Sequence, residues 1–176
     1  MRTNKIIWVC ILIIILSVFP ACNNTENLEP DTGTDMDREH IAKLYYANLQ
    51  YIETGNELIE KYVTVNRRIE GNSKNIYRNV VLALKETPNE PGYATIITDE
   101  INIIDVYVKD KIAYVDISSK NLNGGSLQES FFIGQIVDTL IDSFEEIDAV
   151  QFLVEGEKVE SLMGHIDATQ AFKFVN

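Results

Sequence analysis

Apolar positions along the chain recur with two different spacings, which predict a mixture of strands and helices. Short runs rich in Tyr, Ile, Val and Thr occupy residues 44–47 and 58–65, and Thr54-Gly55-Asn56 separates them. Runs of β-branched and aromatic residues bounded by such turn residues are typical of strands. We therefore expect two strands at the start of the folded region.

The next apolar run has the spacing of a helix. Five residues share one stripe of a helical surface: Ile76, Tyr77, Val80, Val81 and Leu84. Thr87-Pro88 should end this helix, because a proline disfavours helical conformation in the residue before it. Proline and glycine residues then favour a loop over residues 89–100.

Two β-rich runs, residues 103–108 and 112–117, flank Lys109-Asp110-Lys111 and predict a hairpin. A two-residue turn at Asp110-Lys111 would give the hairpin an apolar face and a polar-aromatic face. On the apolar face the expected pairs are Val108 with Ala113, Val106 with Val115, and Ile104 with Ile117. On the other face they are Tyr107 with Tyr114, and Asp105 with Asp116. Because lysine disfavours the positive φ of a type I′ turn, a longer turn with a shifted register is the alternative.

The polar-aromatic face of this hairpin is a candidate partner-binding face. Helices should cover the apolar side of such a sheet, and water or a partner should meet the other side. Tyr107 and Tyr114 are anchors of the kind that interfaces favour, although the N-terminal strands or a loop could cover them instead. Asp105 and Asp116 could share a proton or hold a cation, but opposed carboxylates are ordinarily screened by solvent.

The strongest helical signal follows Asn123-Gly124-Gly125. Ser126 and Glu129 have the spacing of a capping box, in which the two side chains bind backbone amides at the start of a helix. Six apolar residues then share one stripe: Ile133, Ile136, Val137, Leu140, Ile141 and Phe144. Four acidic residues are expected on the solvated side rather than around a cation: Asp138, Asp142, Glu145 and Glu146.

The last strong pattern is an apolar strand over residues 150–154, which Glu155-Gly156 turns towards residues 159–162. The full order is therefore strand, strand, helix, hairpin, helix, strand. This order predicts an α+β fold in which two helices pack on one face of a mixed β-sheet.

The first residues of the chain have the pattern of an export signal. Arg2 and Lys5 precede an apolar run over residues 6–19. As a helix this run would span about 21 Å, which is less than a hydrocarbon core of about 30 Å. We therefore predict a signal peptide over residues 1–21, with an uncleaved signal-anchor as the alternative.

The segment after the signal is predicted to be an anchor and a linker. Ala21-Cys22 resembles the lipobox of bacterial lipoproteins, in which the cysteine receives a diacylglyceryl group and palmitate and becomes the first mature residue. Phe19-Pro20 departs from the usual residues of that motif. The polar segment that follows has too few apolar residues to fold. We expect a lipidated, disordered linker over residues 22–39 and a folded domain over residues 40–176.

Charge and composition narrow the classes of function. The chain has 15 Lys+Arg against 27 Asp+Glu, a net charge of −12, so its surface has no general attraction for nucleic acid. Two Cys and two His are too few for a zinc site, and we expect neither a metal nor a cofactor. The chain also lacks a serine in a strained turn that could act as a nucleophile, so we expect no enzyme.

The ordered series of motifs resembles the GerMN domain of bacterial sporulation and spore-germination proteins. The motifs are Leu44-Tyr45-Tyr46, Val115-Asp116-Ile117-Ser118, Gly124-Gly125-Ser126-x-x-Glu129, Ile136-Val137-x-Thr139-Leu140, Val150-Gln151-Phe152-Leu153-Val154-x-Gly156 and Gly164-His165-Ile166-Asp167. The resemblance implies a fold similar to the ring-building motif of secretion systems, an αββαβ core with extra N-terminal strands. It also implies structural roles for Ser126, Glu129, Gly156, Gly164, His165 and Asp167.

These observations predict a lipoprotein anchored through Cys22 to the extracytoplasmic face of the bacterial cell membrane. Its non-catalytic domain is expected to bind envelope or sporulation proteins in sporulation, spore germination or envelope assembly, and self-association is left open. The alternatives are a solute-binding lipoprotein and a general envelope or peptidoglycan-associated factor.

Overall fold

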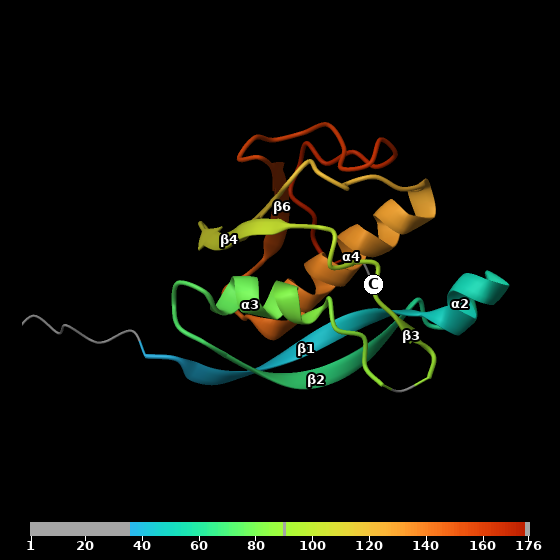
Figure 1. Ribbon diagram of the computed structural model, residues 1–176, viewed down its shortest axis with the longest axis horizontal. Coiled ribbons are helices and arrows are strands. Elements are labelled where there is room, and N and C mark those ends of the chain that lie inside the picture. The colour runs from blue at the N-terminus through green and yellow to red at the C-terminus, as the bar shows by residue number, and fades with distance from the viewer. Residues whose placement is uncertain (1–35, 90, 175–176) are drawn as a thin grey trace, which may run out of the picture. The chain divides into compact units, whose positions relative to one another are not determined.

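The computed structural model describes residues 36–89 and 91–174 (Figure 1). The elements are β1 (Arg38–Asn48), α2 (Leu49–Thr54), β2 (Tyr62–Gly71), α3 (Ile76–Ala83), β3 (Tyr93–Ala94), β4 (Ile103–Lys109), β5 (Ile112–Ile117), α4 (Ser126–Ser143) and β6 (Ala149–Val154). The predicted signal peptide over residues 1–21, the lipidation site Cys22 and the linker as far as residue 35 lie outside the described residues.

The predicted αββαβ core is confirmed in the second half of the chain. Strands β4, β5 and β6 form a sheet in that order, with β5 antiparallel to β4 and parallel to β6. Helices α3 and α4 pack on one face of this sheet, where the apolar side chains of both strands and helices join one core. The fold is therefore α+β, with two helices on one face of a mixed sheet.

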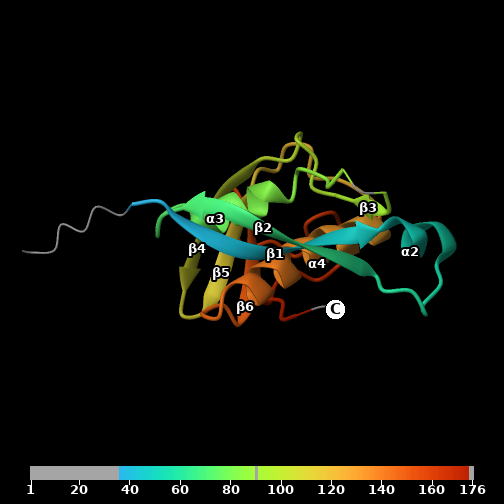
Figure 2. The same cartoon turned by 90° about the horizontal axis from the view of Figure 1, so that it is seen from below.

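The N-terminal strands form a second sheet rather than extending the first. Its order is β2-β1-β3, and β1 pairs antiparallel with both neighbours. Helices α3 and α4 contact strands of both sheets, so the helices form a middle layer between them (Figure 1). Figure 2, seen from the side of β1 and β2, shows these two strands crossing in front of the helices. The two sheets thus shield opposite sides of the helices from water.

This second sheet corrects the prediction that Asp138 lies on a solvated helix face. Every residue of α4 from Phe131 to Leu140 is buried, and Asp138 has no exposed surface. The pattern of apolar residues identified only the side of α4 that packs on the β4-β5-β6 sheet. The other side carries polar residues because it meets the backbone of β1.

Three polar side chains of α4 satisfy the edge of β1 that β3 leaves unpaired. The Lys43 amide donates to Ser143 Oγ at 3.0 Å, and the Tyr45 amide donates to Thr139 Oγ1 at 3.0 Å. Gln135 donates through Nε2 to the Tyr45 carbonyl at 3.0 Å. Thr139 and Ser143 are four residues apart on α4, a rise of about 6 Å, and the two amides that they bind are two residues apart on β1, a rise of about 6.8 Å. The spacing of the helix side chains therefore matches the spacing of the strand amides.

The hairpin register is confirmed from Asp105 to Lys109, including Tyr107 opposite Tyr114. Asp110 and Lys111 adopt positive φ values of 51° and 63°, as a two-residue type I′ turn requires, so the longer turn is not formed. The predicted pairing of Ile104 with Ile117 is wrong. A register shift between Ile103 and Asp105 places Ile103 opposite Ile117 and buries it, while Ile104 becomes exposed.

The N-terminal elements differ from their predicted bounds. Strand β1 begins at Arg38 and includes the last two residues of the predicted linker, because backbone pairing with β2 needs no apolar side chains. The strand predicted over residues 58–65 begins at Tyr62 and continues to Gly71. Helix α2 precedes it, with Asn48 accepting a hydrogen bond from the Gln50 amide at its start. None of the α2 residues is buried, so no apolar stripe signalled this helix.

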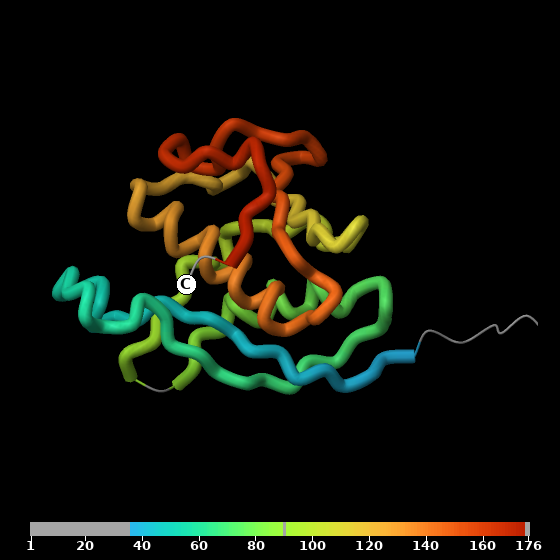
Figure 3. The backbone as a smooth tube through the Cα atoms, turned by 180° about the vertical axis from the view of Figure 1, so that it is seen from behind, coloured from blue at the N-terminus to red at the C-terminus, as the bar shows by residue number. Residues whose placement is uncertain are grey.

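The C-terminal segment returns along β6 after crossing the far end of the core (Figure 3). Val150 forms an antiparallel bridge with Phe172, and the Phe172 ring packs against that of Phe152 at 5.7 Å. Phe174 then contacts the Tyr45 ring at 5.9 Å. This segment covers the β6 side of the sheet and leaves the β4–β5 side open.

Candidate functional site

The open face of the β4–β5 hairpin, defined by Asp105, Tyr107, Tyr114 and Asp116, is the candidate site. The rings of Tyr107 and Tyr114 stack with centroids 5.1 Å apart and an interplanar angle of 9°. Tyr107 keeps 42% of its surface exposed, and Tyr114 is half-buried. The cross-strand pair therefore forms a rigid aromatic platform at the edge of the sheet.

The two aspartates of the hairpin face are each held by a backbone amide. Asp105 accepts a hydrogen bond at 2.8 Å from the amide of Val106, the next residue of β4. Asp116 accepts at 2.9 Å from the Gly156 amide in the turn after β6. The carboxylates lie opposite each other in the register but are bound by different segments of the chain.

A third carboxylate, that of Glu155, lies beside this end of the hairpin. One of its oxygens accepts from the Ser119 amide at 2.9 Å and from the Ser118 hydroxyl at 2.8 Å. These hydrogen bonds, the one from the Ser119 amide first, lower the pKa of Glu155. Asp105, Asp116 and Glu155 are thus all positioned by neutral donors.

Four basic side chains of the described segments form ion pairs, and each pairs with a carboxylate outside the hairpin face. The ion pairs are Lys43 with Asp142, Arg67 with Glu86, Arg68 with Glu39, and Lys111 with Asp148. Within residues 36–89 and 91–174, none joins a Lys or Arg to the carboxylates of the hairpin face or to Glu155. The end of the face that carries the aspartates therefore keeps an uncompensated negative charge.

Glu129 does not form the predicted capping box with Ser126. Gly125 is the N-cap of α4, without a side-chain hydrogen bond, and Ser126 is already the first helical residue. Glu129 is fully buried and accepts backbone hydrogen bonds from the segment that follows β6. The donors are the amides of Leu162 at 3.0 Å, Met163 at 2.8 Å, His165 at 2.8 Å and Ile166 at 3.1 Å.

Glu129 therefore fixes the segment that carries the Gly164-His165-Ile166-Asp167 motif. Gly164 has a φ of 95°, which favours glycine and turns this segment around the carboxylate. The His165 ring lies 3.1 Å from the Gly124 carbonyl, and Asp167 accepts from the Thr169 amide and hydroxyl. The hydroxyl and then the amide of Thr169 lower the pKa of Asp167. The sequence motifs include both Glu129 and the 164–167 segment. No local pattern indicates that the two are bonded to each other, because more than thirty positions separate them.

The remaining predicted position, Gly156, lies in the turn after β6. Glu155 and Gly156 have φ values of 52° and 83°, and Val154 bridges to Glu157 across them. This is the tight turn that the sequence predicts. It places the Gly156 amide against Asp116 and so connects the turn to the hairpin face.

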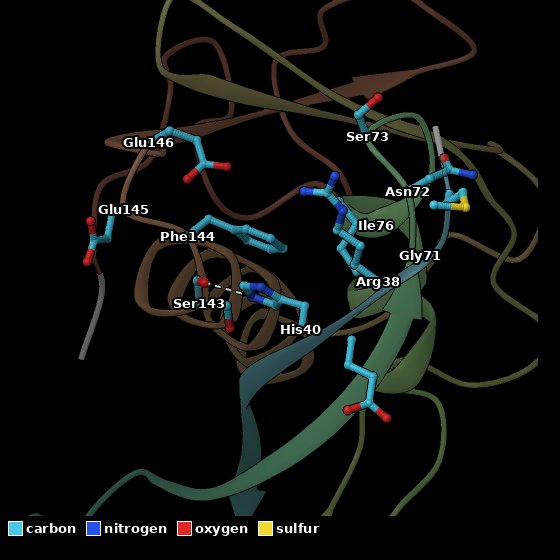
Figure 4. Close-up of a pocket in the computed structure, with 12 residues that line it drawn as sticks. Arg38, His40, Gly71, Asn72, Ser73, Ile76, Ser143, Phe144, Glu145 and Glu146 are labelled. Atoms are coloured by element: carbon cyan, nitrogen blue, oxygen red, sulfur yellow. Dashed lines mark hydrogen bonds between the residues drawn. The ribbon is translucent and has the colours of Figure 1, made fainter. Parts of the chain in front are cut away.

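A cleft of about 790 Å³ lies at the N-terminal end of β1, at residues for which no sequence pattern predicts a site (Figure 4). The His40 ring stacks on Phe144 at 4.3 Å and contacts the Ser143 carbonyl through Nε2 at 2.9 Å. Arg38 directs its guanidinium into the space between Phe144 and Ser73, and Glu146 borders the same space. The cleft is open and its lining mixes both charges.

Among the described residues, no group of three or more His, Cys, Asp or Glu side chains is arranged to hold a metal ion. No helix over the same residues combines the length and apolarity needed to cross a membrane.

The fold is shared with solved structures. A protein from Clostridium perfringens assigned as a lipoprotein is 19% identical with a TM-score of 0.52, covering 78% of this chain and 88% of that one. The first GerMN domain of the Bacillus subtilis sporulation protein GerM is 16% identical with a TM-score of 0.54, covering 73% and 92%. The tandem GerMN domains of the same protein are 14% identical with a TM-score of 0.58, covering 76% of this chain and 46% of theirs.

The sequence itself identifies the family. No curated protein matches the chain. The sequence model of the Germane family, described as sporulation and spore germination, matches residues 43–160, which include β1 from residue 43, every later strand, both packed helices and the hairpin face. The chain therefore belongs to the Germane family of sporulation and spore germination proteins.

Proposed function

We propose that this chain is a lipid-anchored extracytoplasmic protein whose domain binds another envelope or sporulation protein and catalyses no reaction. The observation that carries the proposal is the stacked Tyr107–Tyr114 pair on the hairpin face, where Tyr107 keeps 42% of its surface exposed. Aromatic residues on such a face are anchors of protein interfaces. Family membership supports a role in sporulation or spore germination.

The anchor would act by restricting the domain to a layer next to the membrane. The sequence places fifteen residues between Cys22 and β1, and a coil of that length has a reach of roughly 19–23 Å. Such a tether raises the effective concentration of the hairpin face towards partners in the same membrane. A lipoprotein assignment for the Clostridium perfringens neighbour supports this arrangement.

The test of the interaction replaces Tyr107 and Tyr114 together by Ala in the organism that encodes the chain. Thr64→Ala, on the outward side of β2, is the matched control. We expect normal amounts of both variants in the membrane fraction but a loss of sporulation or germination only for the double variant. Normal spore formation and germination by the double variant would contradict the proposed role of this face.

The anchor has its own test, Cys22→Ala. We expect the variant to leave the detergent phase in which the wild-type chain partitions, because two acyl chains give stable binding and their loss removes it. A Cys22→Ala chain that stays in the detergent phase would show that an uncleaved helix holds it.

Solute binding is the second candidate function, because the cleft beside His40 combines aromatic and charged groups. The cleft is open, however, whereas small-molecule sites enclose most of their ligand. Thermal unfolding in the presence of amino acids, sugars and polyamines distinguishes the two candidates. The interaction proposal expects no shift in the unfolding temperature, and a saturable shift abolished by His40→Ala would favour solute binding.

A further inference from the structure

We propose that the partner presents an extended basic segment to the hairpin face, with one Lys or Arg side chain lying over the Tyr107 ring. This inference rests on the proposed function, because it names the chemistry of the partner that binds the same face. It follows from the ring, the fixed carboxylates and the distribution of charge along the two strands.

The Tyr107 ring has the position needed to receive a cation. Strand β4 is the edge of its sheet, so Tyr114 is the only cross-strand neighbour of Tyr107. One side of the Tyr107 ring is stacked on Tyr114, and 42% of the residue is exposed to solvent. An exposed tyrosine ring held in one orientation attracts ammonium and guanidinium groups through its π-electrons.

The carboxylates next to the ring have the charge that would hold such a cation. Asp105 is two residues from Tyr107 on the same face of β4, and Asp116 lies opposite Asp105 on β5. The amides of Val106 and Gly156 fix the two groups without neutralising them. A basic side chain placed over Tyr107 would therefore meet preorganised acceptors that have no ion-pair partner among the described residues.

The same combination is already filled elsewhere in this domain. Lys43 lies over the Tyr45 ring with its Nζ 5.4 Å from the ring centroid, and the same Nζ is 2.7 Å from Asp142. There the chain supplies ring, carboxylate and cation. On the hairpin face it supplies only the ring and the carboxylates, which points to a cation from another molecule.

The charges on the hairpin face also fix the orientation of the bound segment. Lys109 is exposed and follows Tyr107 on the same side of β4, so the two ends of the tyrosine platform carry opposite charges. The Val106 amide, on the outer edge of β4, is already bound by Asp105. The contact should therefore be made by side chains across the face, with the basic residue of the partner at the Asp105 end.

The test measures binding of labelled decapeptides to the full chain in an uncharged detergent. The probes are an alternating Thr-Arg peptide and a matched Thr-Glu peptide, compared by fluorescence anisotropy at about 0.1 M salt, where surface charges are only partly screened. We expect the Thr-Arg peptide to bind and the Thr-Glu peptide not to bind. Tyr107→Ala and Asp105→Asn should each weaken binding of the Thr-Arg peptide about threefold to tenfold.

Matched variants separate the proposed site from general attraction to an acidic protein. In Asp105→Asn, the side-chain oxygen can still accept a hydrogen bond from the Val106 amide, so the variant removes only the charge. Tyr107→Phe keeps the aromatic ring and should still bind the Thr-Arg peptide. Glu70→Gln removes one exposed negative charge from β2 and should leave affinity for the Thr-Arg peptide unchanged. Lys109→Ala removes a positive charge beside Tyr107 and should raise this affinity slightly. Equal losses for Glu70→Gln and Asp105→Asn, no binding of the Thr-Arg peptide, or better binding of the Thr-Glu peptide would each overturn the inference.

Failure of this inference differs from failure of the proposed function. If the Tyr107→Ala and Tyr114→Ala double variant impairs sporulation or germination but the Thr-Arg peptide does not bind, the face contacts a partner of other chemistry. That result would overturn the inference alone. A double variant without any phenotype would overturn the proposed function, and with it the inference.

Discussion

At the residue scale, Gly134 lets the phenol of Tyr62 lie against the backbone of α4. A Cβ atom at this position would overlap the Tyr62 hydroxyl and approach the ring carbon that carries it. Alanine normally stabilises a helix interior by about 1 kcal/mol relative to glycine. Here the overlap should reverse the sign of that effect.

We therefore expect Gly134→Ala to lower the free energy of unfolding by about 1–3 kcal/mol, because a closely packed site must move to admit the methyl group. Chemical denaturation of the purified protein measures the change. In a Tyr62→Leu background the same substitution should cost much less. A Gly134→Ala protein as stable as the wild type would show that Tyr62 shifts freely, contrary to this packing.

Glu129 provides the second prediction at this scale. Its two oxygens accept from four backbone amides, and glutamine offers one acceptor oxygen and an amide group that repels donors. Glu129→Gln should cost about 1.5–3 kcal/mol of unfolding free energy, the range for hydrogen bonds to a charged group. Hydrogen exchange should accelerate first over residues 162–166.

Glu157→Gln, which alters an exposed carboxylate in the turn after β6, is the control for Glu129→Gln. It should leave both stability and exchange close to those of the wild type. Equal protection of residues 162–166 in the Glu129→Gln protein would contradict the role assigned to the buried carboxylate.

At the element scale, the side chains of α4 replace a strand along part of the β1 edge. Thr139→Val keeps the shape of the side chain but leaves the buried Tyr45 amide without its acceptor. We expect a loss of about 1–3 kcal/mol in unfolding free energy, the cost of an unsatisfied buried donor. Thr64→Val, at an exposed position of β2, should change stability by less than about 0.5 kcal/mol.

The contact between β1 and the last turn of α4 gives a pH-dependent prediction. Hydrogen bonds from Lys43 first, and then from Tyr45, lower the pKa of Asp142 from its ordinary 3.8. A carboxyl with a lowered pKa stabilises the fold at pH values above 3.8, and the contribution is lost as pH falls through the pKa of the folded state. Asp142 is partly exposed, so the contribution at neutral pH should be at most about 1 kcal/mol.

The corresponding measurement compares wild type and Asp142→Asn by denaturation between neutral and acidic pH. The variant should be less stable at pH 7, and the difference should disappear well below pH 3.8. A difference that is constant over the whole range would mean that the carboxylate charge does not contribute.

The elements that the sequence predicted correctly are those whose own residues carry a periodic pattern. Helix α3, the β4–β5 hairpin and β6 have apolar residues at the spacing of the element, and each appears at nearly the expected bounds. Helix α2 has no buried residue, and the second half of β2 is polar, so neither carried such a pattern. The amides that bind Glu129 and the β1 backbone that meets the polar side of α4 belong to segments distant in the chain, which a local pattern does not contain.

The candidate site likewise has one part that the sequence pattern predicts and another part that it does not. The alternation along β4 and β5 is sufficient to predict that Tyr107, Tyr114, Asp105 and Asp116 share one face, and the register confirms it. The bulge at Ile104 and the amides that fix the two aspartates arise from backbone geometry. The cleft beside His40 arises where β1, the β2–α3 turn and the end of α4 meet, and these segments are far apart in the sequence.

At the scale of the whole molecule, the domain consists of three layers, two sheets with the helices between them, and the hairpin face lies on the outer side of one sheet. Helices α3 and α4 are covered on both sides by sheets, and the C-terminal segment covers β6. In the described part of the chain, Tyr107 and Tyr114 belong to neither cluster of buried apolar residues, and their rings stack on each other at the surface of the hairpin.

The most direct test of this account places a photoreactive amino acid at position 107 in cells that are forming or germinating spores. The control carries the same residue at Thr64 on the outward side of β2. We predict a discrete crosslink between position 107 and one membrane or envelope protein, and none from position 64. Crosslinks of equal yield from both positions, or none from position 107, would contradict the claim that the hairpin face binds a partner.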